Sequence, residues 1–242
     1  MTRYPSSYEA PNTWGTVETR DTTGVIASFM NMVYAWMCVG LVTTAVVAYW
    51  VSSQAGVLRS VFAPRMFIIL VLAELGLVVA ISYAINRISA SVATVLFLVY
   101  SGLNGLTLSA IFVAYDLATV GLAFGVTAGM FLTMSILGFV TRANLASLGG
   151  FLLMALVGLI IASIANMFLA STTLDWIVSY AGVAIFLGLT VYDTQRLKVL
   201  ALETAGRGEL AARMAIVGSL MLYLDFVNLL LFILRILGRS KD

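Results

Sequence analysis

Two aspartates in apolar stretches are the residues of this chain whose type and position most favour chemistry. Asp193 lies in GLTVYDTQRLK, and Asp225 lies in LMLYLDFVNLLLFILRILG, at the middle of the apolar run 214–237. Two carboxyl groups that meet in a poorly hydrated site cannot easily both ionise, so the pair titrates as a unit. Such a pair can sense pH near neutrality in a chain that contains no histidine.

Both aspartates could have purely structural roles instead of a functional one. A charged group inside hydrocarbon costs at least about 2.5 kcal/mol, so it usually has a partner, water or a task. Asp225 could be a protonated carboxyl group that hydrogen-bonds to a neighbouring helix. Asp193 could form a surface salt bridge with Arg196, three residues later. Asn228 follows Asp225 at helical spacing, so both would lie on one polar stripe facing into a bundle.

Two further charged residues share these apolar surroundings. Glu74 lies in LVLAELGLVV, and Arg87 ends the same apolar run. The spacing leaves three roles open for Glu74: it lines an ion path, it pairs with Arg87, or it is a buried neutral acid. We treat Glu74 and Asn228 as candidate ion-pathway residues beside the aspartates.

Several classes of mechanism are excluded by residue types that the chain lacks. Without histidine there is no Ser-His-Asp triad and no HExxH zinc site. The single cysteine, Cys38, is expected to be a small buried apolar residue. An intramembrane aspartyl protease would require GxGD and PAL motifs, but no proline follows Pro64. We therefore expect neither an enzyme nor a resident cofactor, and a net charge of +2 without a basic run gives no support for nucleic-acid binding.

The composition places these residues in a membrane protein. Hydrophobic residues make up 62% of the chain, charged residues make up 10%, and the mean hydropathy is +1.06. Each crossing of a hydrocarbon core about 30 Å thick needs about 20 apolar residues. The sequence predicts an all-α bundle of seven transmembrane helices, with the spans 29–51, 66–86, 92–114, 118–140, 148–170, 176–195 and 214–237.

Basic residues predict the orientation of these spans. Lysine and arginine are concentrated at the amino-terminal end and between residues 194 and 213, whereas the loops around Asp116 and Asp175 have none. The positive-inside rule places the former segments in the cytoplasm. The basic carboxyl end conflicts with seven crossings, so a re-entrant seventh segment is the alternative. We expect residues 1–28 to form a flexible cytoplasmic tail, 29–238 the membrane domain and 239–242 a short carboxyl tail.

Small and polar residues inside the spans predict how helices pack. Gly121, Gly125 and Gly129 recur every four residues, as do Ala184 and Gly188. Such stripes let helix backbones approach closely in lipid. A second group, Ser101, Asn104 and Thr107, is expected to hydrogen-bond between helices.

The sequence resembles the transmembrane Bax inhibitor motif family, particularly its bacterial members. The resemblance is carried by INRIS at 85–89, LYSGLNGLTLSAIF within 98–112, TAGMF at 127–131, VYDTQRLK at 191–198 and YLDFVNLLLFILRILG at 223–238. It implies six helices around a central seventh and a pH-sensitive calcium leak. It also implies that Asp193 and Asp225 form the functional pair and that Arg87 is a latch, although Arg65 opens the same span.

The resemblance and the residues together predict a pH-sensitive calcium leak channel in a bacterial inner membrane. Calcium prefers oxygen ligands, which Asp193, Asp225 and Asn228 would supply. In the closed state Arg87 would bind one carboxylate, and a change in the pair's protonation would release it. The alternative is a membrane interaction protein whose cytosolic tail restrains a membrane-bound quality-control protease.

Overall fold

The computed structural model describes residues 22–85, 87–141, 143 and 145–239. The described part of the chain is helical and contains no strand. Its helices are α1 (Thr22–Ser52), α2 (Ala55–Val61), α3 (Pro64–Ala84), α4 (Ala90–Leu108), α5 (Ile111–Ala114), α6 (Leu117–Val140), α7 (Ala146–Leu169), α8 (Thr172–Glu203) and α9 (Gly208–Arg239). Seven spans, with α4 and α5 forming one of them, are long and apolar enough to cross a membrane, which confirms the predicted bundle.

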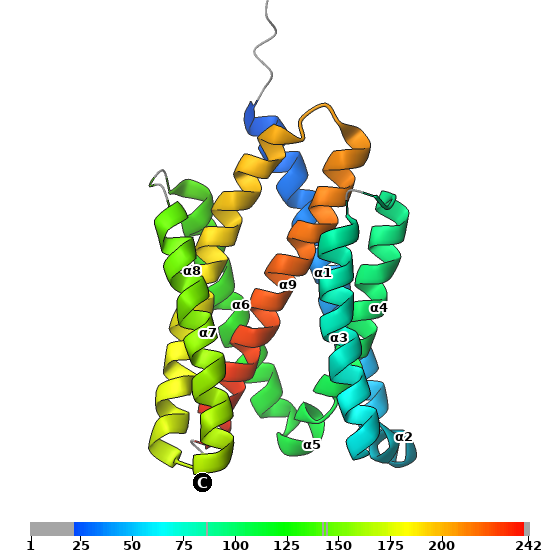
Figure 1. Ribbon diagram of the computed structural model, residues 1–242, viewed down its shortest axis with the longest axis vertical. Coiled ribbons are helices and arrows are strands. Elements are labelled where there is room, and N and C mark those ends of the chain that lie inside the picture. The colour runs from blue at the N-terminus through cyan, green and yellow to red at the C-terminus, as the bar shows by residue number, and fades with distance from the viewer. Residues whose placement is uncertain (1–21, 86, 142, 144, 240–242) are drawn as a thin grey trace, which may run out of the picture.

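Helix α9 is the central element of this bundle (Figure 1). It packs against α8, α1, α6 and α4, while α3 packs mainly on α4 and α7 mainly on α8. Half of its most apolar segment is buried, compared with a third or less in every other span. The predicted central seventh helix is therefore confirmed, with α3 and α7 at the periphery of the bundle.

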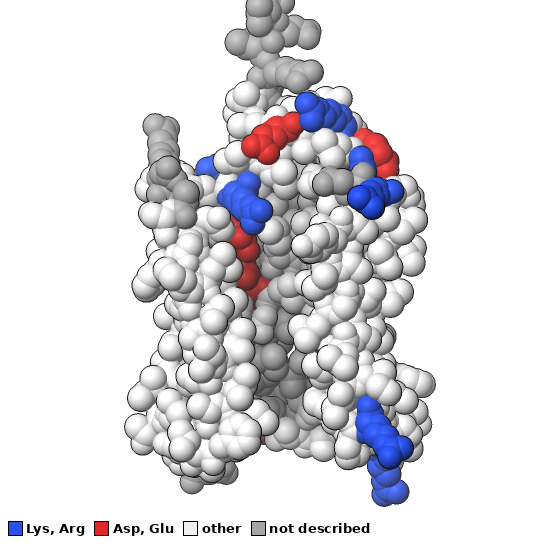
Figure 2. Space-filling view, in the orientation of Figure 1, with Lys and Arg blue, Asp and Glu red and all other residues white. Residues whose placement is uncertain are grey.

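The ends of α9 lie at opposite ends of the molecule (Figure 1). The helix is continuous over 32 residues, a length of about 48 Å at 1.5 Å per residue. That length exceeds the hydrocarbon core, and the helix contains no return turn. The re-entrant alternative is therefore wrong for the seventh segment. On the face shown in Figure 2, charged groups lie near the two ends and in one central furrow, with uncharged atoms elsewhere.

The segment between the last two spans is shorter than predicted. Helix α8 continues to Glu203 and α9 begins at Gly208, so most of the expected loop over residues 194–213 is helical. Leu197 and Ala201 stabilise this extension because both are buried on one helical face. The chain then reverses through Gly206, whose φ of 76° lies in the left-handed region that glycine adopts readily.

The first turns of α9 hold the turn between α3 and α4. Nη1 of Arg213 donates hydrogen bonds to the carbonyl oxygens of Ile85 and Ile88, both at 3.2 Å. A carboxylate oxygen of Glu209 accepts from the backbone N–H of Ala90 at 2.7 Å, at the start of α4. Arg213 and Glu209 thus satisfy backbone groups that helix ends leave without partners.

Helix α1 begins inside the segment that the sequence assigns to the tail. It starts at Thr22, so residues 22–28 are helical and not part of a tail. Residues 1–21 lie outside the described residues, as does the predicted carboxyl tail beyond Arg239. The membrane domain therefore includes the start of α1.

Two packing expectations are corrected. A Cβ placed on Gly121, Gly125 or Gly129 would meet nothing within 4 Å, so this stripe faces away from the other described helices. Gly188 does support packing, because a Cβ there would lie 2.9 Å from Leu152 on α7. Cys38 is exposed on α1 rather than buried. Periodicity along one helix identifies a face, but the neighbouring helices decide whether that face is covered.

Candidate functional site

Helices α8 and α9 bring Asp193 and Asp225 together. Their carboxyl groups lie close enough to interact directly. Two glycines allow the close approach: a Cβ on Gly182 would lie 2.7 Å from the Phe232 ring, and one on Gly218 would lie 2.5 Å from Leu197. Each glycine lies on a different helix of the pair.

The environment of Asp225 is closed to solvent. The residue is 4% exposed, and its Oδ2 atom has no hydrogen-bond partner among the described residues. Two carboxylates are acceptors only, so a hydrogen bond between two carboxyl groups requires one of them to carry a proton. Two carboxyl groups this close in a buried site therefore favour a state in which they share a proton.

Both aspartates line a cavity of about 540 Å³ between α7, α8 and α9. Most of its lining is apolar, and Asn228 adds an amide group. The Asn228 amide donates to the carbonyl of Leu224 at 2.8 Å, which leaves its side-chain oxygen available. Figure 2 shows acidic atoms in a furrow on this face, below a basic group. This space, which we call the aspartate cavity, combines two carboxyl groups, an amide, the hydroxyl groups of Ser163 and Tyr192 and the guanidinium group of Arg196 with otherwise apolar walls.

The structure does not bring Arg87 to the aspartates. Arg87 is exposed in the turn after α3, and it makes no ion pair within the described residues. The basic residue near the pair is Arg196, which lines the aspartate cavity and acts electrostatically on Asp193. No salt bridge joins Arg196 and Asp193 in the described structure. Their spacing of three residues along one helix is the sequence signal for this proximity.

Glu74 belongs to a separate buried polar network. One of its oxygens accepts from the Thr107 hydroxyl at 2.9 Å, and the other from the Asn104 amide at 3.4 Å. The Tyr223 hydroxyl donates to Asn104 Oδ1 at 3.0 Å and lies 2.6 Å from the hydroxyl of Thr44. These contacts confirm the predicted bonds between helices for Asn104 and Thr107, whereas the Ser101 hydroxyl donates to the carbonyl of Phe97 within α4. Glu74 does not pair with Arg87 in the described structure.

Tyr223 is a residue that the sequence reasoning did not single out. It is completely buried, and its ring makes edge contacts with Phe97 and Tyr100. It precedes Asp225 by two positions on α9. The network of Glu74 therefore reaches the same helix that carries the central aspartate.

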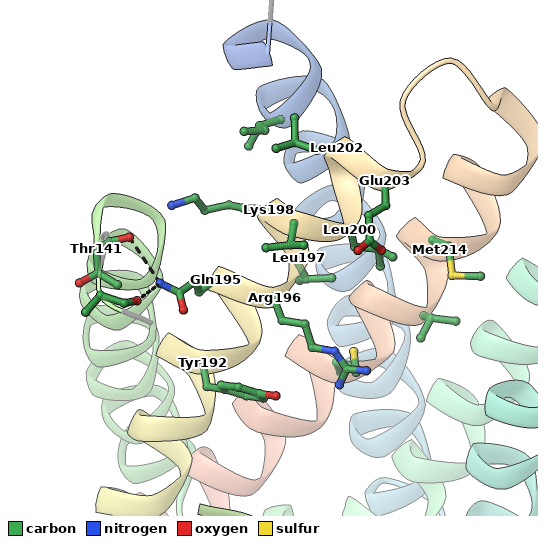
Figure 3. A pocket seen from close by; sticks show the side chains of 15 residues that line it. Thr141, Tyr192, Gln195, Arg196, Leu197, Lys198, Leu200, Leu202, Glu203 and Met214 are labelled. Atoms are coloured by element: carbon green, nitrogen blue, oxygen red, sulfur yellow. Dashed lines mark hydrogen bonds between the residues drawn. The ribbon is translucent and has the colours of Figure 1, made fainter. Parts of the chain in front are cut away.

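A second cavity, of about 680 Å³, lies at the end of α8 that carries Glu203 (Figure 3). Gln195 points from α8 to the loop after α6, where its amide donates to the carbonyl of Ala143 at 2.7 Å. Lys198 donates to the carbonyl of Phe139 and lies over the Phe139 ring. We call this space the outer cavity, because it lies at the end of the bundle where α8 turns into α9.

Residues 26–242 match the family described as inhibitor of apoptosis-promoting Bax1. The chain belongs to the Bax inhibitor family. It is 45% identical over 219 residues to the inner membrane protein YbhL of Escherichia coli K12, covering 89% of this chain and 93% of that protein.

Two further Bax inhibitor relatives are similar over nearly the same extent. A Borreliella burgdorferi protein is 44% identical over 215 residues, covering 88% of this chain and 93% of the relative. A Deinococcus radiodurans protein is 45% identical over 217 residues, covering 90% of this chain and 92% of the relative. The family match over residues 26–242 includes the spans that carry both aspartates, and the described part of the chain has seven helices long and apolar enough to cross a membrane.

Proposed function

We propose that this Bax inhibitor family protein is a calcium leak channel of a bacterial inner membrane, controlled by the protonation of the pair formed by Asp193 and Asp225. The observation that carries the proposal is the close approach of two carboxyl groups that line the aspartate cavity. Burying a carboxyl group in a membrane bundle costs free energy unless hydrogen bonds satisfy all its polar atoms. Carboxyl groups that are buried there often mark ion or proton pathways. The unpartnered Oδ2 of Asp225 supports the pathway role.

The oxygen ligands in the aspartate cavity are too few for a tight calcium-binding site, which favours calcium passing through. Calcium usually takes six to eight oxygen ligands. The cavity offers two carboxyl groups and the Asn228 amide, and the described residues contain no cluster of three or more metal-ligating His, Cys, Asp or Glu side chains. Conduction requires binding that is weak enough for the ion to leave. Calcium is therefore the transported ion, and the aspartates contact it transiently.

The orientation follows from the basic residues at the end of the bundle that contains the turn from α8 to α9. The positive-inside rule places this end, and the start of α1, in the cytoplasm. The outer cavity then opens to the cytoplasmic side. The inner-membrane location is supported by the similarity to the E. coli inner membrane protein YbhL.

Calcium uptake by purified protein in liposomes tests the proposal. A calcium-sensitive dye inside the vesicles reports flux across a series of pH values, with empty liposomes as the control. We expect flux above the control that changes with pH. Flux equal to the control at every pH would overturn the channel function and favour the interaction protein that restrains a membrane protease.

The latch role of Arg87 is tested in the same assay. In the described arrangement Arg87 does not contact the aspartates, so a latch requires a closed state in which the turn after α3 moves toward them; in that case Arg87→Gln should raise the leak at the pH where the parent protein conducts least. Arg207→Gln is the matched control, since Arg207 is also an exposed arginine in a turn at this end of the bundle. An unchanged leak in Arg87→Gln would remove Arg87 from the mechanism and leave the aspartate pair untouched.

A further inference from the structure

The aspartate cavity and the outer cavity share one boundary. Three residues line both spaces: Tyr192 and Arg196 on α8, and Met221 on α9. In Figure 3 the Arg196 side chain extends from α8 across toward the neighbouring helix, whereas Lys198 points to the opposite side. The two cavities are therefore adjacent, and the direct route from one to the other runs past these three residues.

Arg196 is the charged member of the boundary. It is exposed, and its guanidinium group makes no hydrogen bond or salt bridge within the described residues. The second basic residue of the outer cavity, Lys198, is held by the carbonyl and the ring of Phe139. The outer cavity also contains an acidic group, Glu203, which lies farther along α8 than Arg196. The positive charge at the boundary itself is thus supplied by Arg196.

We propose that Arg196 is an electrostatic barrier between the two cavities, which limits the passage of cations and sets the charge selectivity of the path. The proposal rests on the calcium-channel function above. Like charges repel, and the repulsion grows in proportion to the charge of the ion, so a divalent cation is opposed more strongly than a monovalent one. Fixed basic groups lining a pore favour anions over cations.

Three substitutions separate charge from shape in the liposome assay. Arg196→Lys keeps the charge, so its calcium flux should remain close to that of the parent protein. Arg196→Gln removes the charge and should raise calcium flux severalfold. Arg196→Glu should raise it further and increase the preference for calcium over a monovalent cation, measured from reversal potentials in planar bilayers. Arg207→Gln serves as the control and should change neither quantity.

A chemical readout tests the barrier without relying on conduction. Met221→Cys in a Cys38→Ala background places a thiol at the boundary. Cationic and anionic methanethiosulfonate reagents of similar size are then compared, and Arg196 should make the cationic reagent slower relative to the anionic one. We call the rate of modification by the cationic reagent divided by that by the anionic reagent the labelling ratio. Arg196→Gln should raise the labelling ratio severalfold. High salt should also reduce the difference in the parent background, because salt screens exposed charges.

The outcomes separate the two proposals. Absence of flux in the parent protein would overturn the calcium channel, while the labelling ratio would still report on Arg196. The barrier is overturned if Arg196→Gln matches Arg207→Gln in flux and also leaves the labelling ratio unchanged. Should Arg196→Gln fail to fold, a labelling ratio that is insensitive to salt in the parent background would overturn the barrier by itself.

Discussion

Tyr223 and Asn104 connect the central helix to the opposite side of the bundle through a buried hydrogen bond of 3.0 Å. Asn104 also donates to Glu74 on α3, so the contact joins α3, α4 and α9. Thr44 adds α1, since its hydroxyl group lies 2.6 Å from that of Tyr223. The helix that carries Asp225 is therefore fixed by polar contacts on one side, while its other side borders the aspartate cavity.

Removing the Tyr223 hydroxyl group should destabilise the bundle. Tyr223→Phe leaves the ring contacts in place but takes one hydrogen-bond partner from Asn104 and one from Thr44. Leaving buried polar groups without partners costs about 1–3 kcal/mol. Thermal unfolding in detergent should show a clear decrease in melting temperature, with Tyr83→Phe as the control because Tyr83 is 86% exposed. Equal melting temperatures for both variants would contradict a stabilising network.

Replacing either aspartate of the pair should remove most of the pH dependence of calcium flux. Asp193→Asn and Asp225→Asn nearly preserve volume, but each leaves a single titratable carboxyl group at the site. The double variant should add little to the single changes, because residues that act as a unit are non-additive. Flux in liposomes across a pH series measures this. If both single variants keep the parental pH profile, the coupled pair does not control conduction.

The contact between α9 and the turn after α3 should be measurable by hydrogen exchange. Arg213→Gln removes a charged donor from the carbonyls of Ile85 and Ile88, and hydrogen bonds of charged groups contribute about 1.5–3 kcal/mol. The backbone amides of Ile88 and Ala90 should then exchange faster. Arg207→Gln, an exposed neighbour, should leave them unchanged. Protection that is equal in both variants would show that Arg213 does not hold this turn.

Topology can be tested by labelling single cysteines with an impermeant reagent. The background must lack Cys38, because this thiol is exposed on α1. Gly208→Cys lies at the start of α9, and Thr172→Cys lies at the start of α8 at the other end of the bundle. The two positions should be labelled from opposite sides of the membrane, with Gly208→Cys accessible from the cytoplasm. Labelling of both from one side would contradict the bilayer placement of α8.

The spans and the aspartates were predictable because their signals are local. The length of each apolar run predicts a membrane-spanning helix. A charged residue inside hydrocarbon costs free energy however the helices pack, so Asp193 and Asp225 can be identified from the sequence as candidate functional residues. The α6 glycine stripe was misassigned, because the covered face of a helix is decided by its neighbours. For the same reason Arg196 and Tyr223 did not stand out: their roles depend on the rotation of α8 and α9 about their axes.

The continuity of α8 and α9 has a mechanical consequence. Both helices run without a break from the membrane interior to the turn at Gly206, and each is 32 residues long. At 1.5 Å per residue each helix is about 18 Å longer than a hydrocarbon core of about 30 Å, so part of this hairpin projects beyond it. A force applied to the projecting hairpin is transmitted along two stiff rods to the carboxyl groups. We therefore expect a load placed on this turn to displace the two carboxyl groups, without a ligand entering the membrane.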